Sequence, residues 1–248
     1  MSLHAWQTSL SDLVIARAAG VPASVTAADA CLSDAERHWL TRLTDTPGFR
    51  VTCDIQRWWR EFRVQSAAPL TLSLLGPGRR QDVVLEFARR NPKPSSFFIR
   101  EALPFLDLAA ELAPDVPHLT ELAAFERAML LLGQALAGGQ AVGVGELDPH
   151  ANVQAHPLAA VVRFKAPPDR ILAAAARGLA LPPVEDRAYC LLIATRLPNL
   201  ARACSGDEAA VFDTLRQGPA DPCALGGDPV SAAALTTLWQ AGALRQAA

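Results

Sequence analysis

The chain has 248 residues, 50% of them hydrophobic and 19% charged, and its formal net charge is -2. This composition is typical of a folded protein and not of a disordered one, and the length suits one large domain or two small ones. The small negative charge excludes a global positive field of the kind that draws proteins to nucleic acid or anionic lipid.

We find no targeting or membrane-spanning signal in the sequence. The start, MSLHAWQTSLSDLV, has neither the basic flank nor the apolar run of a signal peptide. No stretch approaches the roughly 18 unbroken apolar residues of a membrane span. We therefore expect a cytoplasmic protein that binds neither a membrane nor nucleic acid.

The first half of the chain predicts helices separated by short breaks. Residues 1–25 predict a short helix followed by a loop. The next helix should begin at Ser33 and Asp34, whose side chains can accept hydrogen bonds from the first free amides. Thr46 can cap a third helix, and Pro47 suits its first position. Further helices are expected at 79–91, 96–113 and 119–136, after a short apolar segment at 69–76.

The segment RVTCDIQRWWREFRV at 50–64 predicts a strongly amphipathic helix. At 100° per residue its large apolar side chains share one broad face, namely Val51, Ile55, Trp58, Trp59 and Phe62. Its charged side chains fall opposite: Arg50, Asp54, Arg57, Arg60 and Glu61. We expect Trp58, Trp59 and Phe62 to lie in the core, although Trp and Arg are also common in the anchoring centres of protein interfaces. The alternatives of a partner-facing side and a merely solvated face remain open for Arg57, Arg60 and Arg63.

A stretch rich in glycine and turn formers separates two halves with different patterns, and we take it as a linker between domains. The elements expected beyond it are strands at 158–164, 188–196 and 197–203 and helices at 169–178, 206–218 and 228–244. Strands followed by helices outline a small winged-helix-like fold. The predicted fold class is therefore α+β, with a mostly helical domain at 1–137, the linker at 138–157, and a winged-helix-like domain with a short antiparallel sheet at 158–248.

No catalytic or metal-binding motif stands out. The five cysteines form no CxxC pair and are expected to be free thiols. Only two histidines, His150 and His156, are close in sequence, and with Asp148 they lie in a turn-rich stretch without a helix to fix metal geometry. The sequence contains no nucleophile elbow, dinucleotide-binding or P-loop glycine motif. We expect no metal, no cofactor and no catalytic residue in this chain.

A winged-helix ending raises the question of DNA binding, which the charge pattern argues against. Residues 206–248 contain five carboxylates and two arginines, a net charge of -3. The helix expected to end the domain presents mainly Ala, Leu and Thr, whereas a recognition helix needs basic and amide side chains to reach phosphates and base edges. That helix is better suited to binding protein.

Several motifs of the first half resemble the MbnC family of methanobactin biosynthesis. They are DTPGFRVTCDIQRWW (45–59), TLSLL (71–75), SSFFIREALPFLDL (95–108) and LAAFERAMLL (122–131), in that order and spacing. The resemblance implies a non-catalytic partner of MbnB, an iron-containing barrel enzyme that oxidises cysteines of a precursor peptide to oxazolone and thioamide groups with oxygen. It also implies that the iron belongs to the barrel subunit and that the C-terminal part helps to hold the leader peptide.

Two sets of candidate residues follow from this resemblance and from the pattern of strands. An extended leader could add to an exposed strand edge, with nearby side chains forming pockets. The leader-binding candidates are Cys190, Leu191, Leu192, Ile193, Ala194, Thr195, Leu200, Ala201, Leu235, Leu238 and Trp239. The partner-binding candidates are Arg57, Trp58, Arg60, Phe97, Phe98, Phe125 and Arg127. The alternatives are a subunit of a related iron barrel enzyme that makes another modified peptide, and a winged-helix transcription regulator.

Overall fold

The structure is a computed structural model that describes residues 3–21, 32–91, 98–139, 148 and 150–247. These residues are mostly helical and include a small antiparallel sheet, so the predicted α+β class is confirmed. The chain forms two compact units, residues 1–112 and 113–248. This division falls before the linker expected at 138–157, because the helix at 119–137 packs against the sheet of the second unit.

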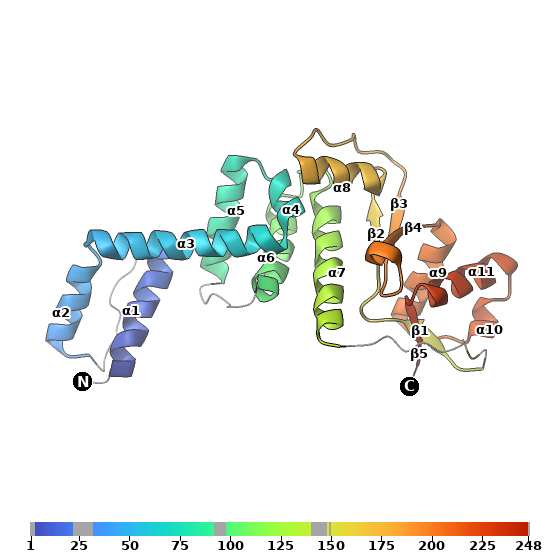
Figure 1. Ribbon diagram of the computed structural model, residues 1–248, viewed down its shortest axis with the longest axis horizontal. Helices are drawn as coiled ribbons and strands as arrows, with labels where there is room; N and C mark the ends of the chain where they lie inside the picture. Colours follow the sequence, from blue (N-terminus) through green and yellow to red (C-terminus); the bar gives the residue numbers. More distant parts are fainter. Residues whose placement is uncertain (1–2, 22–31, 92–97, 140–147, 149, 248) are drawn as a thin grey trace. The chain divides into compact units, whose positions relative to one another are not determined.

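Unit 1 consists of helices, as the first half of the sequence predicts (Figure 1). They are α1 (Leu3–Ala18), α2 (Asp34–Leu43), α3 (Pro47–Ala67), α4 (Pro69–Leu74), α5 (Pro77–Arg90) and α6 (Phe98–Leu112). The expected start of α3 is confirmed, since the Thr46 side chain accepts a hydrogen bond from the Phe49 amide and Pro47 is the first helical residue. The apolar segment at 69–76 becomes the short helix α4.

The long helix α3 organises unit 1, because α1, α4 and α6 all pack against it. The side chains that α3 buries are Phe49, Cys53, Arg60 and Val64. Beyond α3, Phe87 of α5 and Phe105 of α6 meet edge to face, with ring centroids 5.6 Å apart, and both are almost completely buried. Such aromatic pairs add to the stabilisation that burial of apolar area provides.

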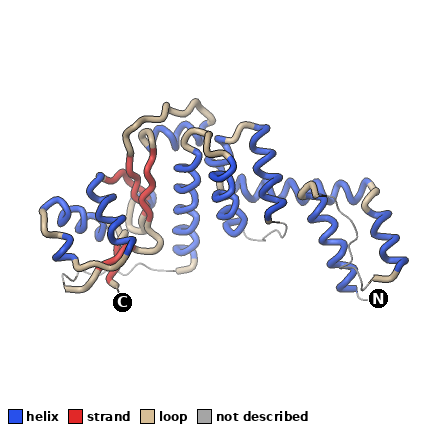
Figure 2. The backbone as a smooth tube through the Cα atoms, turned by 180° about the vertical axis from the view of Figure 1, so that it is seen from behind, coloured by secondary structure: helices blue, strands red, loops and turns tan. Residues whose placement is uncertain are grey.

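Unit 2 combines helices with two small sheets (Figure 2). Its elements are α7 (Leu119–Ala137), β1 (Val153–Ala155), β2 (Ala160–Phe164), α8 (Pro168–Arg177), β3 (Tyr189–Ile193), β4 (Ala201–Cys204), α9 (Gly206–Gln217), α10 (Pro222–Leu225), α11 (Pro229–Gln240) and β5 (Leu244–Gln246). The order β2-β3-β4 makes one antiparallel sheet, and β1 pairs with β5 in the other. The strands expected at 188–196 and 197–203 correspond to β3 and β4, which pair as an antiparallel hairpin.

Helices cover both faces of the three-stranded sheet. Alternate residues of β3 point to opposite faces, and Leu192 and Ala194 join the core formed with α9 and α11. Leu191 and Ile193 point the other way, where α8 packs against β3 and α7 packs against β2. The sheet is therefore a middle layer, so that only the edges of its outer strands remain for further backbone pairing.

Candidate functional site

The outer side of α3 carries a continuous row of large apolar side chains, which we call the aromatic stripe. It comprises Val51, Ile55, Trp58, Trp59 and Phe62 of α3 together with Phe98 of α6, and each of these side chains is exposed. Trp58 has 55% of its surface accessible. The expectation that Trp58, Trp59 and Phe62 form the core is therefore wrong. The helix instead buries its opposite side against α1 and α6.

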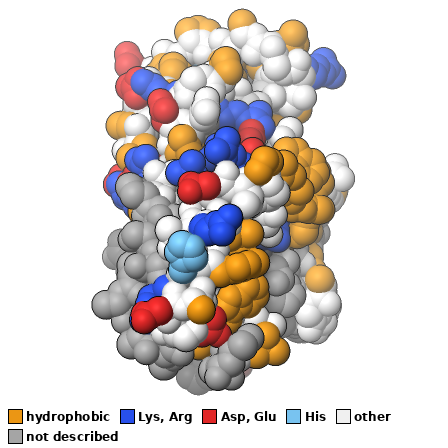
Figure 3. Space-filling model, turned by 90° about the vertical axis from the view of Figure 1, so that its left-hand side faces the viewer, with side chains coloured by type: hydrophobic (Ala, Val, Ile, Leu, Met, Phe, Trp, Pro, Cys, Tyr) orange, Lys and Arg blue, Asp and Glu red, His pale blue; other side chains and the backbone are white. Residues whose placement is uncertain are grey.

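The aromatic rings of the stripe rest on one another. Trp58 stacks on Phe62 at 5.4 Å between centroids, and Trp59 meets both rings edge-on at 5.0 and 5.6 Å. Phe98 extends the cluster from α6, with its ring 6.3 Å from that of Phe62. Figure 3 shows one face of the molecule, on which hydrophobic side chains gather beside arginines. Contiguous exposed apolar surface of this kind is typical of protein-binding sites.

The arginines of α3 mainly hold unit 1 together and do not face outward as a group. Arg60 has only 5% of its surface exposed and donates hydrogen bonds to the carbonyl oxygens of Ala88 and Asn91. Its Nε lies 3.8 Å from a carboxylate oxygen of buried Glu101, and Arg63 approaches the same carboxylate at 3.5 Å. Arg60 is thus buried, contrary to its expected place on a partner-facing side. Its pKa is lowered by burial and partly restored by Glu101.

Arg57, on the flank of α3, also links this helix to a neighbouring part of unit 1. Its Nε donates to the carbonyl oxygen of Ala18 at the end of α1, at 3.1 Å. Arg57 also lines two hollows, of about 470 and 450 Å³. In the larger hollow, Arg80 is already bonded to Glu61 and Gln65. The charges there are satisfied within the chain, so the hollow does not indicate a particular ligand.

The β3 residues that were expected to bind a leader peptide belong to the central strand of the sheet. Both sides of β3 are paired, with β2 and with β4, so the expectation of an open edge at 189–195 is wrong for this strand. Leu192, Ile193 and Ala194 are fully buried. The expected pocket residues also belong to the core: Leu235 and Leu238 are buried and Trp239 packs against them. These side chains hold unit 2 together and do not line a groove.

Of the two strands expected to offer an edge to a leader peptide, only β4 is an outer strand in the described sheet. The Ala194 amide donates to the Leu200 carbonyl, which fixes the alternation of hydrogen bonds along the β3–β4 ladder. Arg202 and Cys204 consequently direct their backbone groups toward β3, whereas Ala201 and Ala203 direct theirs to the outer edge. The Arg202 side chain donates to the Ala203 carbonyl at 2.8 Å and pairs with Glu208 of α9.

The remaining partner-binding candidates are spread over both units. Phe98 belongs to the aromatic stripe, and Phe97 lies outside the described residues. Phe125 and Arg127 are half-buried on α7 in unit 2. Sequence reasoning missed Val51, Ile55, Trp59 and Phe62 as surface candidates because it assigned the whole apolar face to the core. The smaller set of apolar residues on the opposite side of α3, namely Phe49, Cys53 and Val64, was the signal that a second apolar face existed.

The described part of the chain offers no metal-ligand cluster and no membrane-spanning helix. Within it, no three His, Cys, Asp or Glu side chains are grouped so as to hold a metal ion. The His150 amide bonds to Asp148, and the His156 Nδ1 accepts from the Leu158 amide. Burial lowers the pKa of His156. None of the described helices is long and apolar enough to cross a bilayer.

Neither a scan against protein-family models nor a search of curated proteins found a match to this chain.

Proposed function

We propose that this chain is a non-catalytic, MbnC-like subunit of a heterodimeric, iron- and oxygen-dependent complex that modifies cysteines of a precursor peptide. In this proposal the iron belongs to a barrel-shaped partner enzyme, and the products are oxazolone and thioamide groups. The observation that carries the proposal is the exposed aromatic stripe of unit 1. A stripe of this size suits a permanent partner better than a solvated surface.

The composition of the stripe supports a protein as the occupant. Tryptophan and phenylalanine supply large contact areas at low cost in side-chain entropy, and tryptophan is enriched among the residues that dominate binding energies. The stripe lies on the side of α3 opposite the buried Cys53 and Val64, so its use as an interface leaves the core of unit 1 intact. The motifs that resemble the MbnC family include Trp58, Trp59 and Phe98 of the stripe.

Removing the centre of the stripe should abolish assembly. We expect the double variant Trp58→Ser/Phe62→Ser to bind an MbnB-like iron barrel enzyme at least about 100-fold more weakly than the wild type, because two central aromatic anchors are lost. The measurement is co-expression followed by size-exclusion chromatography and titration of the purified subunits.

The matched control is Trp39→Ser, which removes a tryptophan that is also 50% exposed but lies on α2, outside the stripe. This variant should retain full affinity for the partner. The assignment of the stripe as the partner interface would be refuted if the wild-type chain did not bind the barrel enzyme, or if the Trp39 variant lost as much affinity as the stripe variant. Co-purification with an iron barrel enzyme that modifies a different peptide would favour the related-enzyme alternative.

We also propose that unit 2 is a winged-helix-like peptide-recognition module in which the leader pairs with the outer edge of β4. The β3–β4 hairpin followed by α9 and α11 supports this, as does the outward direction of the Ala201 and Ala203 backbone groups. Backbone pairing supplies affinity for an extended peptide whatever its charge. The pairing requires the Arg202 side chain to release the Ala203 carbonyl.

A proline at the outer edge tests this pairing without breaking the sheet. We expect Ala203→Pro to weaken leader binding about tenfold or more, because it removes an outward donor and places a ring where the peptide backbone would lie. The ladder to β3 does not use this donor, so circular dichroism should show an intact fold. Ile193→Pro, by contrast, should disrupt the sheet, since Ile193 is paired on both sides.

The control for this experiment is Arg202→Ala, which removes the side chain that occupies the Ala203 carbonyl and should leave leader affinity equal to or slightly above that of the wild type. Affinity should also fall only modestly between low and physiological salt, because few ion pairs are screened. Leader affinity that is unchanged in the Ala203 variant would show that recognition lies elsewhere.

A further inference from the structure

Two of the five cysteines face each other across neighbouring strands. Cys190 of β3 is directly opposite Cys204 of β4 in the antiparallel register. Their side chains point to the same face of the sheet, in one row with Arg163 of β2. Both thiols are half-buried and free, whereas Cys53 is buried and Cys223 lies exposed on α10.

The strand geometry allows the two sulfur atoms to bond. Residues opposite each other at a hydrogen-bonded position of an antiparallel pair have Cα atoms about 5.5 Å apart, which lies within the range of disulfides. Their Cβ atoms are somewhat farther apart than a relaxed disulfide prefers, so the bond would form under strain. Strained, accessible disulfides are more easily reduced than structural ones and are typical of regulatory sites.

We propose that Cys190 and Cys204 form a reversible disulfide that clasps the edge strand β4 to β3. The oxidant is a low-molecular-weight disulfide such as glutathione disulfide. The Cys190 thiolate attacks one sulfur of glutathione disulfide and releases one glutathione thiolate, leaving a mixed disulfide. The Cys204 thiolate then attacks the Cys190 sulfur and expels the second glutathione. Two protein thiols are oxidised to one disulfide, two glutathiones are formed, and the protons remain in solution and on glutathione.

The surroundings of Cys204 control the second step. The charged groups that face the two thiols are Arg163 of β2, Arg202 of β4, and Glu208 and Asp213 of α9. Burial, the neighbouring Cys190 and Glu208 raise the pKa of Cys204 to about 12, although Arg202 and Arg163 act against them. Because its thiolate is scarce at neutral pH, Cys204 reacts second and slowly, and closure should accelerate steeply as pH rises.

The clasp has a direct effect on the edge strand. The strand β4 has only four residues, and every ladder bond it makes is to β3. A covalent bond at Cys204 therefore prevents the separation of β4 from β3 that would expose the inward amide of Arg202. This effect concerns the sheet itself and does not depend on the proposed partner or leader peptide.

The test is oxidation of the full chain. Treatment with excess glutathione disulfide, followed by alkylation and trypsin, should link peptide 188–196, which contains Cys190, to peptide 203–216, which contains Cys204. The rate of linkage should rise about tenfold per pH unit between about pH 7 and pH 9. Dithiothreitol should reverse it. Hydrogen exchange at the Arg202 amide should slow about tenfold or more in the oxidised chain.

The controls are Cys190→Ser and Cys204→Ser, in which a single remaining thiol can form only a mixed disulfide with glutathione. The variant Cys223→Ser should behave like the wild type. The proposal would be overturned if Cys190 and Cys204 were each glutathionylated but never linked, or if either one were linked to Cys223. Exchange at Arg202 that is equal in the oxidised and reduced chains would also overturn it.

Discussion

Replacing Glu101 by alanine is expected to lower the free energy of unfolding of unit 1 by about 3–5 kcal/mol, because the change strips a buried cation of its counter-charge. Glu101 is 3% exposed and lies between Arg60 and Arg63. Arg60 itself is buried, so no solvent can replace the lost carboxylate. Urea unfolding of the full chain, followed by the fluorescence of the tryptophans of unit 1, measures the loss.

The matched control is Glu111→Ala on the same helix. Glu111 pairs with Arg90 at 2.8 Å, but its side chain is 60% exposed, and exposed pairs contribute about 0–1 kcal/mol. The double variant Arg60→Met/Glu101→Leu should recover most of the lost stability, since it removes both buried charges and keeps their volume. A loss in Glu101→Ala no larger than in Glu111→Ala would mean that the carbonyl oxygens of Ala88 and Asn91 are enough to stabilise the Arg60 cation.

Two aromatic substitutions in unit 1 should differ sharply in their effect on stability. Phe87→Ala is expected to cost about 3–5 kcal/mol, because Phe87 is 1% exposed and packs against Phe105 and the Arg60 guanidinium. Trp58→Ala should cost less than about 1 kcal/mol, because most of its ring already faces solvent. Thermal and urea unfolding of both variants give the comparison.

This pair of variants also distinguishes the two faces of α3. If Trp58→Ala proved as destabilising as Phe87→Ala, the stripe would be a core surface and could not be offered to a partner. Retained stability together with lost partner binding in the stripe variants is the combination expected of an interface.

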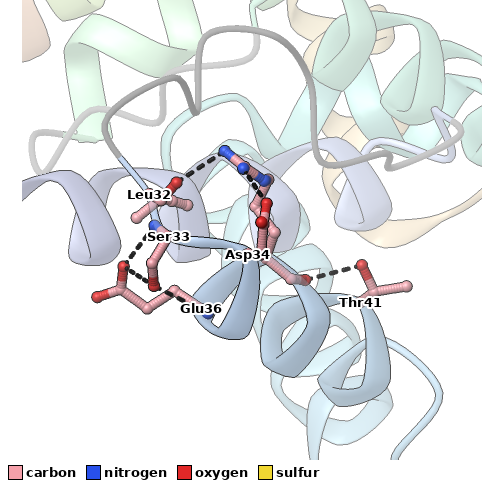
Figure 4. Close-up of polar contacts among 6 residues, drawn as sticks. Leu32, Ser33, Asp34, Glu36 and Thr41 are labelled. Carbon is pink, nitrogen blue, oxygen red and sulfur yellow. Dashed lines mark hydrogen bonds and ion pairs between the residues drawn. The ribbon is translucent and has the colours of Figure 1, made fainter.

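Elements with local signals were predictable from the sequence. The cap of α2 is an example (Figure 4): the Ser33 hydroxyl accepts from the Glu36 amide, and the Glu36 carboxylate accepts from the Ser33 amide at 2.8 Å. The hydrogen bonds that the Ser33 amide and hydroxyl donate to the Glu36 carboxylate lower the pKa of Glu36. Ser33 and Thr46 signal helix starts because a capping side chain satisfies amides only three residues away. The starts of α2 and α3 could therefore be predicted from the sequence, and so could the neighbouring strands β3 and β4.

The buried side of α3 could not be read from periodicity. Apolar residues occur on both sides of this helix, with Phe49, Cys53 and Val64 opposite the stripe, and the larger set proved to be the exposed one. The side that is buried depends on where α1 and α6 pack, which is tertiary information. The central place of β3 was missed for the same reason, since it depends on pairing with β2.

The pairing of β1 with β5 bears on the order in which unit 2 acquires its structure. Val153 is opposite Gln246, about ninety residues along the chain, and the three-stranded sheet with α8 through α11 lies between them. Closing so long a loop costs more chain entropy than closing the β3–β4 hairpin, which spans only a few residues. The β3–β4 hairpin should therefore form early in folding, and the β1–β5 pair should form after the transition state. Mutations in β5 should then mainly accelerate unfolding and hardly slow folding.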